Sequence, residues 1–182
     1  SSIVLHRMDN KPVVVLASIF QHSPLVLVTL SSSKLRTPED LLGKRVMFQK
    51  GVDGAAITAM FSILSITDQD YQHIPHNFDD SSLMRREVDA ISAYITNQPF
   101  WYKSKGYEVN VIDPINYGVD FYGDLLFTKQ SYVESNPERA KAFADASIKG
   151  WHYALDNKEE IVDLIYQKYS RRNSKAMLAH EA

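Results

Sequence analysis

The sequence predicts an α/β fold with a parallel or mixed sheet, and three observations support this. Short apolar runs alternate along the chain with segments of helical character. Two of these runs, 13–19 (VVVLASI) and 25–30 (LVLVTL), are continuous and rich in β-branched residues, which is typical of strands covered on both faces. The chain has 182 residues, enough for one large domain or two small lobes with a buried core.

The strand segments follow in order, each bounded by turn residues. After the two runs above, further short segments combine β-branched or aromatic residues with flanking Gly, Pro, Asn or Asp. The predicted strands are 13–19, 25–30, 45–48, 71–75, 89–95, 109–112 and 125–128.

Helix starts are predicted from caps and first-turn prolines. Thr37 and Pro38 precede two acids, and Gly43 would end that helix, while Asp53 can cap the helix that follows the turn at Gly51. The other predicted helices are the opening segment, a short one from Asp79 or Asp80 to Arg86, one from Asn136-Pro137, and one capped by Asn157 with Glu160.

The helix that begins at Pro137 carries a stripe of mostly apolar residues. Phe143 and Trp151 lie two turns apart on this stripe, together with Ala140, Ser147 and Leu155. We therefore expect Trp151 to be buried against a sheet.

Composition excludes several classes of function. The net charge of −2 gives no electrostatic footprint for nucleic acid. The absence of cysteine excludes disulfides, thiol catalysis and thiolate metal sites. The longest apolar run, 13–19, is too short to cross a bilayer.

Motifs for catalysis, metals or cofactors are absent from the sequence. It has no GxSxG, HExxH, P-loop or GxGxxG pattern. His73 and His76 are three residues apart on a predicted strand, which would send them to opposite faces as surface imidazoles. We therefore expect no catalytic residue, no metal site and no cofactor.

Aromatic and polar residues concentrate where predicted strands end. In open α/β sheets, ligands bind at the carboxyl ends of strands, and aromatic faces with a few amide and carboxylate groups suit a small, flat, polar molecule. The alternative is that the aromatic residues belong to the core, that Asp53 only caps a helix, and that Asp120 only organises a turn. The candidate ligand-binding residues are Phe20, Gln21, His22, Ser23, Asp53, Tyr94, Asn97, Tyr117, Asp120 and Tyr122.

Several strings occur here in an order that resembles a known family. They are KPVVVLASIFQHSPLVLV, LRTPEDLLGKRVMF, DAISAYITNQP, YGVDFYGDLLFT and NPERAKAFADASIKGWHYAL. Together they cover nearly the whole chain and resemble the thiamine-pyrimidine-precursor branch of the type II periplasmic binding proteins. The nearest resemblance is to sensory domains fused to bacterial histidine kinases or diguanylate cyclases.

This resemblance implies a two-lobed fold that closes on a small ligand. Lobe one would comprise 1–32 and 118–182, and lobe two would be 33–117, with the strand 25–30 leading from one lobe to the other and 125–128 leading back. Family members carry additional elements upstream, so lobe one would be incomplete at its N-terminus, and the chain would self-associate through it or be less stable than a complete domain.

The function implied is periplasmic binding of a small, nitrogenous aromatic ligand, with Asp120 accepting a hydrogen bond from an exocyclic amine. A membrane-anchored parent protein would pass the signal to a fused kinase or cyclase. The alternatives are the substrate-binding component of an ABC transporter and an enzyme of the pyrimidine-synthase type. Modification of His22 or of a lysine during turnover would distinguish the enzyme.

Overall fold

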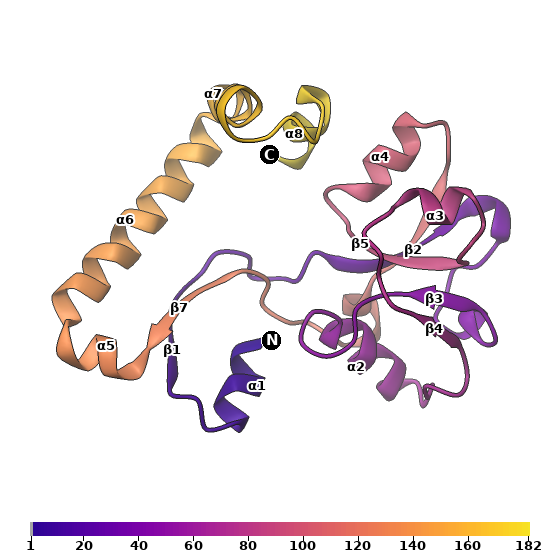
Figure 1. Ribbon diagram of the computed structural model, residues 1–182, viewed down its shortest axis with the longest axis horizontal. Coiled ribbons are helices and arrows are strands. Elements are labelled where there is room, and N and C mark those ends of the chain that lie inside the picture. The colour runs from indigo at the N-terminus through magenta and orange to yellow at the C-terminus, as the bar shows by residue number, and fades with distance from the viewer. Residues whose placement is uncertain (1) are drawn as a thin grey trace. The chain divides into compact units, whose positions relative to one another are not determined.

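The structure, a computed structural model shown in Figure 1, describes residues 2–182, which form two compact units. Unit 2 is the continuous segment Ser23–Phe121. Unit 1 contains the chain up to His22 together with Tyr122–Ala182. The lobe boundaries at residues 32 and 117 stay a prediction.

Unit 2 is built on a five-stranded sheet of order β4-β3-β5-β2-β6. β3 runs parallel to β4 and β5, whereas β2 is antiparallel to β5 and β6, so the sheet is mixed, as predicted. The strands are β2 (Leu25–Leu30), β3 (Arg45–Met47), β4 (Gln72–Ile74), β5 (Ala90–Tyr94) and β6 (Val109–Ile112). The expected lobe boundary assigned β2 to lobe one, but its backbone groups pair on both edges within the sheet of unit 2.

Helices cover both faces of this sheet. They are α2 (Ala55–Ile63), α3 (Ser81–Met84) and α4 (Gln98–Ser104), with short 3₁₀ turns η1 (Ser31–Ser33), η2 (Glu39–Leu41) and η3 (Pro114–Tyr117). Leu27 belongs to the core cluster that contains the buried residues of α2, while its neighbour Val28 belongs to the cluster that contains Tyr102 of α4. Alternate residues of β2 therefore enter two cores, which explains why the strand is apolar except at Thr29.

Two of the local predictions for unit 2 were wrong, and one helix was not predicted. The helix expected from Thr37 is only the short η2, because the Asp40 carboxylate accepts hydrogen bonds from the backbone N–H groups of Arg36 and Thr37, at 2.8 and 3.0 Å. Asp53 does not cap α2, whose N-cap is Gly54 with no side-chain cap bond. Helix α4, with proline in its first turn, was not predicted.

Unit 1 contains a two-stranded antiparallel sheet, one helix at the N-terminus and the helices of the C-terminal part of the chain. β1 (Val13–Ser18) pairs with β7 (Leu125–Lys129), with an irregularity between Val15 and Ala17. The helices are α1 (Ser2–Met8), α5 (Gln130–Ser135), α6 (Pro137–Asp156), α7 (Lys158–Leu164), a π-helical turn (Ile165–Tyr169) and α8 (Lys175–Glu181). No helix within residues 2–182 has both the length and the apolar character that a membrane crossing requires.

The long helix α6 buries only part of the predicted stripe, which included Ala140. Its buried residues are Ala140 and Ala144, whereas Phe143 is 59% exposed and Trp151 is 41% exposed. The prediction that Trp151 is buried was therefore wrong. Small alanine side chains let a helix approach its neighbour closely, and α6 packs on β1.

The helix α7 begins at the predicted residue but lacks the predicted capping box. Asn157 is its N-cap residue, but the side chain makes no capping bond, and its amide donates back to the carbonyl of Tyr153 at 2.8 Å. Glu160 accepts from the Tyr153 hydroxyl at 2.9 Å instead of completing a capping box.

Candidate functional site

Five strand termini of unit 2 meet at one edge of its sheet, which we call the C-terminal edge. Leu25, the first residue of β2, pairs with Tyr94, the last residue of β5. β6 pairs with β2 in the same antiparallel sense, and β3 and β4 run parallel to β5. Hence β2 begins, and β3, β4, β5 and β6 end, at this edge (Figure 1).

Most of the predicted site residues of unit 2 follow these strand ends. Tyr94 ends β5, Asn97 follows it, and Ser23 lies just before β2. Asp53 lies in the turn after β3, and Tyr117 and Asp120 follow β6. The predicted residues of unit 2 thus lie in the segments that adjoin this edge, and Ser23, Tyr94 and Asn97 lie within three residues of a strand end there. The full set in these segments is Ser23, Asp53, Tyr94, Asn97, Tyr117 and Asp120. Their contact with a ligand stays a prediction.

The turn after β5 is held by its own hydrogen bonds. The backbone N–H of Tyr94 donates to Oε1 of Gln98 at 2.8 Å, and the N–H of Asn97 donates to the carbonyl of Tyr94 at 2.9 Å. The adjacent start of β2 is fixed as well, because the N–H of Leu25 donates to Oγ of Ser23 at 3.3 Å. The Tyr94 side chain is 49% exposed, so a fixed backbone presents an accessible aromatic ring.

The segment after β6 is anchored in the core. Asp113 accepts a hydrogen bond from the N–H of Ile115 at 3.1 Å and begins η3, and Gly118 ends it at a φ of 81°, a left-handed conformation that glycine adopts without strain. Val119 is buried, and Tyr117 packs against the same core cluster. Asp120, one residue further, is exposed.

The phenol of Tyr117 stays protonated at neutral pH. Its partial burial, together with the nearby Glu39 and Asp40 carboxylates, raises its pKa above the usual value. A protonated phenol can both donate and accept a hydrogen bond. Tyr117 therefore offers a polar group as well as a ring, and its phenol lies near the carboxylates of η2.

The loop between β3 and α2 has space only for glycine at position 54. A Cβ atom on Gly54 would lie 1.8 Å from the backbone oxygen of Gln49. The close approach of these two backbones directs the loop into α2 and leaves Asp53 exposed at the edge.

Sequence reasoning missed two groups at this edge. Gln98 closes the turn after β5, as described above, and His76 lies just beyond β4. The ring of His76 links the segment after β4 to β5, since its Nε2 lies 3.3 Å from the carbonyl of Ser92, and its Nδ1 accepts the N–H of Phe78 at 2.9 Å. The strand-end rule applied to segment 71–75 would have identified His76.

The histidines were expected to be surface imidazoles, and this was wrong. His73 is half-buried, with Nε2 2.9 Å from the carbonyl of Phe48 and its ring 4.9 Å from the Phe48 ring. His76 is also half-buried. Both rings fasten neighbouring backbone segments, and residues 2–182 contain no group of three or more His, Asp or Glu side chains arranged to hold a metal ion.

The remaining predicted site residues lie in unit 1, in the two segments where the chain passes from one unit to the other. They are Phe20, Gln21, His22 and Tyr122, all exposed. The two segments are hydrogen-bonded to each other, from the N–H of Ile19 to the carbonyl of Asp124 at 2.9 Å and from the N–H of Gly123 to the carbonyl of Phe20 at 2.8 Å. The Phe20 ring packs edge-on against Trp151, with centroids 5.7 Å apart.

Comparison with known proteins identifies relatives of about twice this length. The formylaminopyrimidine-binding protein of Halalkalibacterium halodurans is 25% identical over 180 residues, which cover 94% of this chain and 53% of the relative. The riboflavin-binding protein RibY of Chloroflexus aurantiacus is 25% identical over 178 residues, covering 92% of this chain and 48% of the relative. The chain thus spans about half the length of the curated relatives it matches.

Solved structures share the fold. The periplasmic aliphatic sulphonate binding protein SsuA of Escherichia coli superposes with a TM-score of 0.76 at 16% identity, covering 98% of this chain and 61% of that one. A protein of Methylobacillus flagellatus KT, described as the periplasmic sulfonate-binding protein of a putative sulfonate ABC transporter, gives a TM-score of 0.69 at 18% identity, covering 99% and 55%. The architecture is therefore the mixed α/β fold of periplasmic binding proteins. Residues 1–161 match the family described as NMT1/THI5 like, and the chain belongs to that family.

Proposed function

We propose that this chain is a solute-binding domain and that it holds a small, nitrogen-containing aromatic ligand at the C-terminal edge of unit 2. The observation that carries the proposal is the set of groups gathered there. Tyr94 and Tyr117 supply aromatic rings, and Asn97 and Asp120 supply an amide and a carboxylate. Such a set suits a flat ring with hydrogen-bonding groups on its rim.

The names of the curated relatives support this class of ligand. A formylaminopyrimidine and riboflavin both contain nitrogen heteroaromatic rings, although the two rings differ in size. Asp120 would accept a hydrogen bond from a ring amine, and the two tyrosines would contact the ring faces. The likeness to sulfonate-binding proteins, at 16% and 18% identity, supports the fold and carries no argument about the ligand.

The role in transport is better supported than the sensory role. Both curated relatives are named as binding proteins, and one of the similar structures is described as part of an ABC transporter. We therefore propose a substrate-binding component that works outside the cytoplasm. The fusion to a kinase or cyclase is supported by the sequence resemblance alone. The pyrimidine-synthase function is less favoured, because both curated relatives are named as binding proteins and not as enzymes.

The test is calorimetric titration of the chain with a formylaminopyrimidine and, separately, with riboflavin. We expect saturable binding of at least one of them. Asp120→Asn should weaken it about 10-fold or more, because a hydrogen bond to a charged group contributes about 1.5–3 kcal/mol. The matched control is Glu108→Gln, which removes an exposed carboxylate beside the first residue of β6, at the opposite edge, and should leave the affinity unchanged.

Three outcomes would contradict the proposal. Each concerns a different part of it: the ligand class, the location of the site, or the assignment as a binding protein. Absence of binding for both rings would contradict the ligand class. Equal loss of affinity in Glu108→Gln and Asp120→Asn would contradict the location. A mass increase on His22 or a lysine after incubation with ligand would favour the enzyme.

A further inference from the structure

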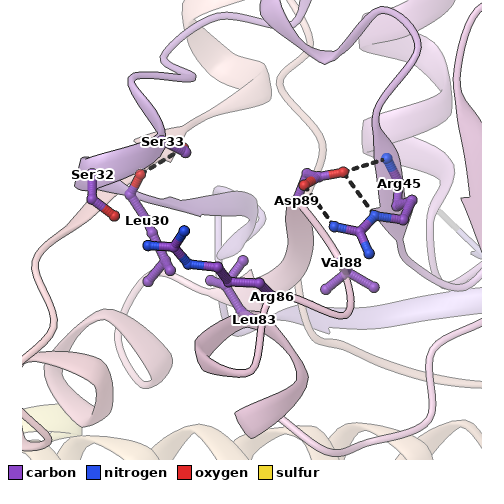
Figure 2. A pocket seen from close by; sticks show the side chains of 8 residues that line it. All are labelled: Leu30, Ser32, Ser33, Arg45, Leu83, Arg86, Val88 and Asp89. Atoms are coloured by element: carbon purple, nitrogen blue, oxygen red, sulfur yellow. Dashed lines mark hydrogen bonds and ion pairs between the residues drawn. The ribbon is translucent and has the colours of Figure 1, made fainter.

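We propose that unit 2 has a second binding site, at the sheet edge opposite the C-terminal edge, for a small organic monocarboxylate with a short apolar tail. A cavity of about 180 Å³ lies there, where β2 ends and where β3 and β5 begin. It is lined by Leu30, Ser32, Ser33, Arg45, Leu83, Arg86, Val88 and Asp89 (Figure 2). This volume lies below the range of about 300–1,000 Å³ that is typical of sites for drug-sized ligands, so the occupant must be smaller.

The charges around the cavity leave one cation available. The charge of Arg45 is paired with that of Asp89, which accepts from its backbone N–H, its Nε and one terminal nitrogen at 2.9, 3.0 and 2.9 Å. The neighbouring Arg85 pairs with Asp79 at 2.9 Å and with Glu87 at 2.8 Å. The nearby carboxylates are thereby committed, and Arg86 forms no salt bridge within residues 2–182.

The backbone of Arg86 is held beside the cavity by a helix-ending motif. Its N–H donates to the carbonyl of Leu83 at 3.1 Å, and the N–H of Glu87 donates to the carbonyl of Ser82 at 3.0 Å. This is the Schellman pattern, with Arg86 at a φ of 59° in the position where glycine is usual. Figure 2 shows its guanidinium directed toward the segment Leu30–Ser33 and away from the Arg45–Asp89 pair.

The opposite rim of the cavity is also fixed before any ligand arrives. The Ser33 hydroxyl donates to the carbonyl of Leu30 at 2.6 Å, and the N–H of Ser31 donates to the carbonyl of Glu108 at 2.9 Å. The exposed Ser32 hydroxyl lines the same rim. A bound group would therefore meet a positioned guanidinium on one side and a hydroxyl on the other.

The lining selects the chemistry of the ligand. A guanidinium binds a carboxylate through two parallel N–H···O bonds, which Arg86 can offer. Leu30, Leu83 and Val88 are each buried and form an apolar wall for a short aliphatic tail. Asp89 would repel a second negative charge, which favours a monoanion over a doubly charged phosphate or sulfate.

The experiment titrates the full chain with butyrate and follows the Nε–H resonance of Arg86 by NMR, with butyramide and sulfate as comparison ligands. We expect a saturable shift with butyrate at millimolar concentrations, because so few ligand atoms cannot supply high affinity. Arg86→Gln should weaken butyrate binding about tenfold or more, followed through backbone amides of the cavity. Arg36→Gln, which removes an exposed guanidinium outside the cavity, should leave the affinity unchanged.

A second variant keeps Arg86 in place. Ser32→Glu adds a carboxylate to the rim that competes for the guanidinium, so it should also weaken butyrate binding, and the amide spectrum of β5 reports whether either variant remains folded. The proposal is overturned if butyrate produces no saturable shift, if butyramide or sulfate binds as well as butyrate, or if butyrate binds Ser32→Glu undiminished.

Discussion

Gly54 is the residue of the C-terminal edge at which one added methyl group should reduce the stability of unit 2 most. A Cβ atom there would lie 1.8 Å from the backbone oxygen of Gln49 and 3.0 Å from Cδ2 of Phe48. Phe48 is fully buried, and the Gln49 oxygen belongs to the backbone, so neither atom can move aside like the end of a flexible side chain. The φ of Gly54 is −108°, which any residue adopts, so space alone requires glycine.

The cost of Gly54→Ala follows from this geometry. Non-bonded carbon atoms separate to about 3.5–4.0 Å at their optimum, so the loop or α2 has to shift by more than an ångström. The residues of α2 that would move with it include Ile57, Met60 and Phe61, all in the core. Overpacking costs typically 1–3 kcal/mol and occasionally more, and we expect about 3 kcal/mol or more here.

A glycine in α6 provides a control of opposite sign. A Cβ atom on Gly150 would meet nothing within 4 Å, and this residue lies inside a 20-residue helix. Gly150→Ala should therefore stabilise unit 1 by about 0.5–1 kcal/mol, because alanine loses less backbone entropy than glycine in a helix.

The two tryptophans allow each unit to be followed separately. Trp101 lies in unit 2 and packs against its core, and Trp151 lies in unit 1. In a Trp151→Phe background, urea unfolding followed by fluorescence reports unit 2, and Trp101→Phe gives the corresponding signal for unit 1. A change below about 0.5 kcal/mol in unit 2 for Gly54→Ala, within the scatter of surface substitutions, would refute the argument from space.

Three further predictions concern stability. Asp89→Asn should cost about 1–2 kcal/mol at pH 7, since the pair with Arg45 is partly exposed and screened by solvent. Hydrogen bonds from Arg45 lower the Asp89 pKa, so the contribution is present above the unfolded value of about 3.9 and is lost as pH falls through the folded pKa. The urea midpoints of the variant and the wild type should therefore approach each other as the pH is lowered below about 3.9. Trp151→Ala should cost less than the 3–5 kcal/mol of a buried aromatic, because 41% of that residue is exposed, and a loss in the full range by urea unfolding would contradict its placement. Tyr102→Phe should cost about 1–3 kcal/mol by removing the hydroxyl that donates to the Asp80 carbonyl at 2.7 Å; a neutral result in the same assay would show that this buried bond adds nothing.

Strand positions were readable from the sequence because burial on both faces leaves continuous apolar runs. The predicted strands 25–30 and 109–112 coincide with β2 and β6. The order of the strands was not readable, since pairing such as that of Leu25 with Tyr94 joins segments far apart in the chain. The gathering of Ser23 and Asn97 at one edge depends on that order.

Errors in the helices have a common physical origin. The stripes containing Phe143 and Ala144 lie one residue apart on α6, and which of them is buried depends on how closely β1 approaches, which no local pattern records. Aspartate is similarly ambiguous, because Asp40 binds backbone N–H groups that precede it, whereas a helix cap binds those that follow. For Asp40, local chemistry identified the hydrogen-bonding residue and could not choose its partner.

The pairing of β1 with β7 has a consequence for biosynthesis. All of unit 2 lies between these two strands in sequence, so β1 leaves the ribosome long before its partner exists. Closing so long a loop from an unfolded chain is slow and entropically costly. In unit 2, however, β2 and β6 are paired neighbours, so folding of that unit brings the ends of the intervening segment together and shortens the effective loop. Translation therefore favours an order in which unit 2 folds first and thereby brings β1 and β7 close enough to pair.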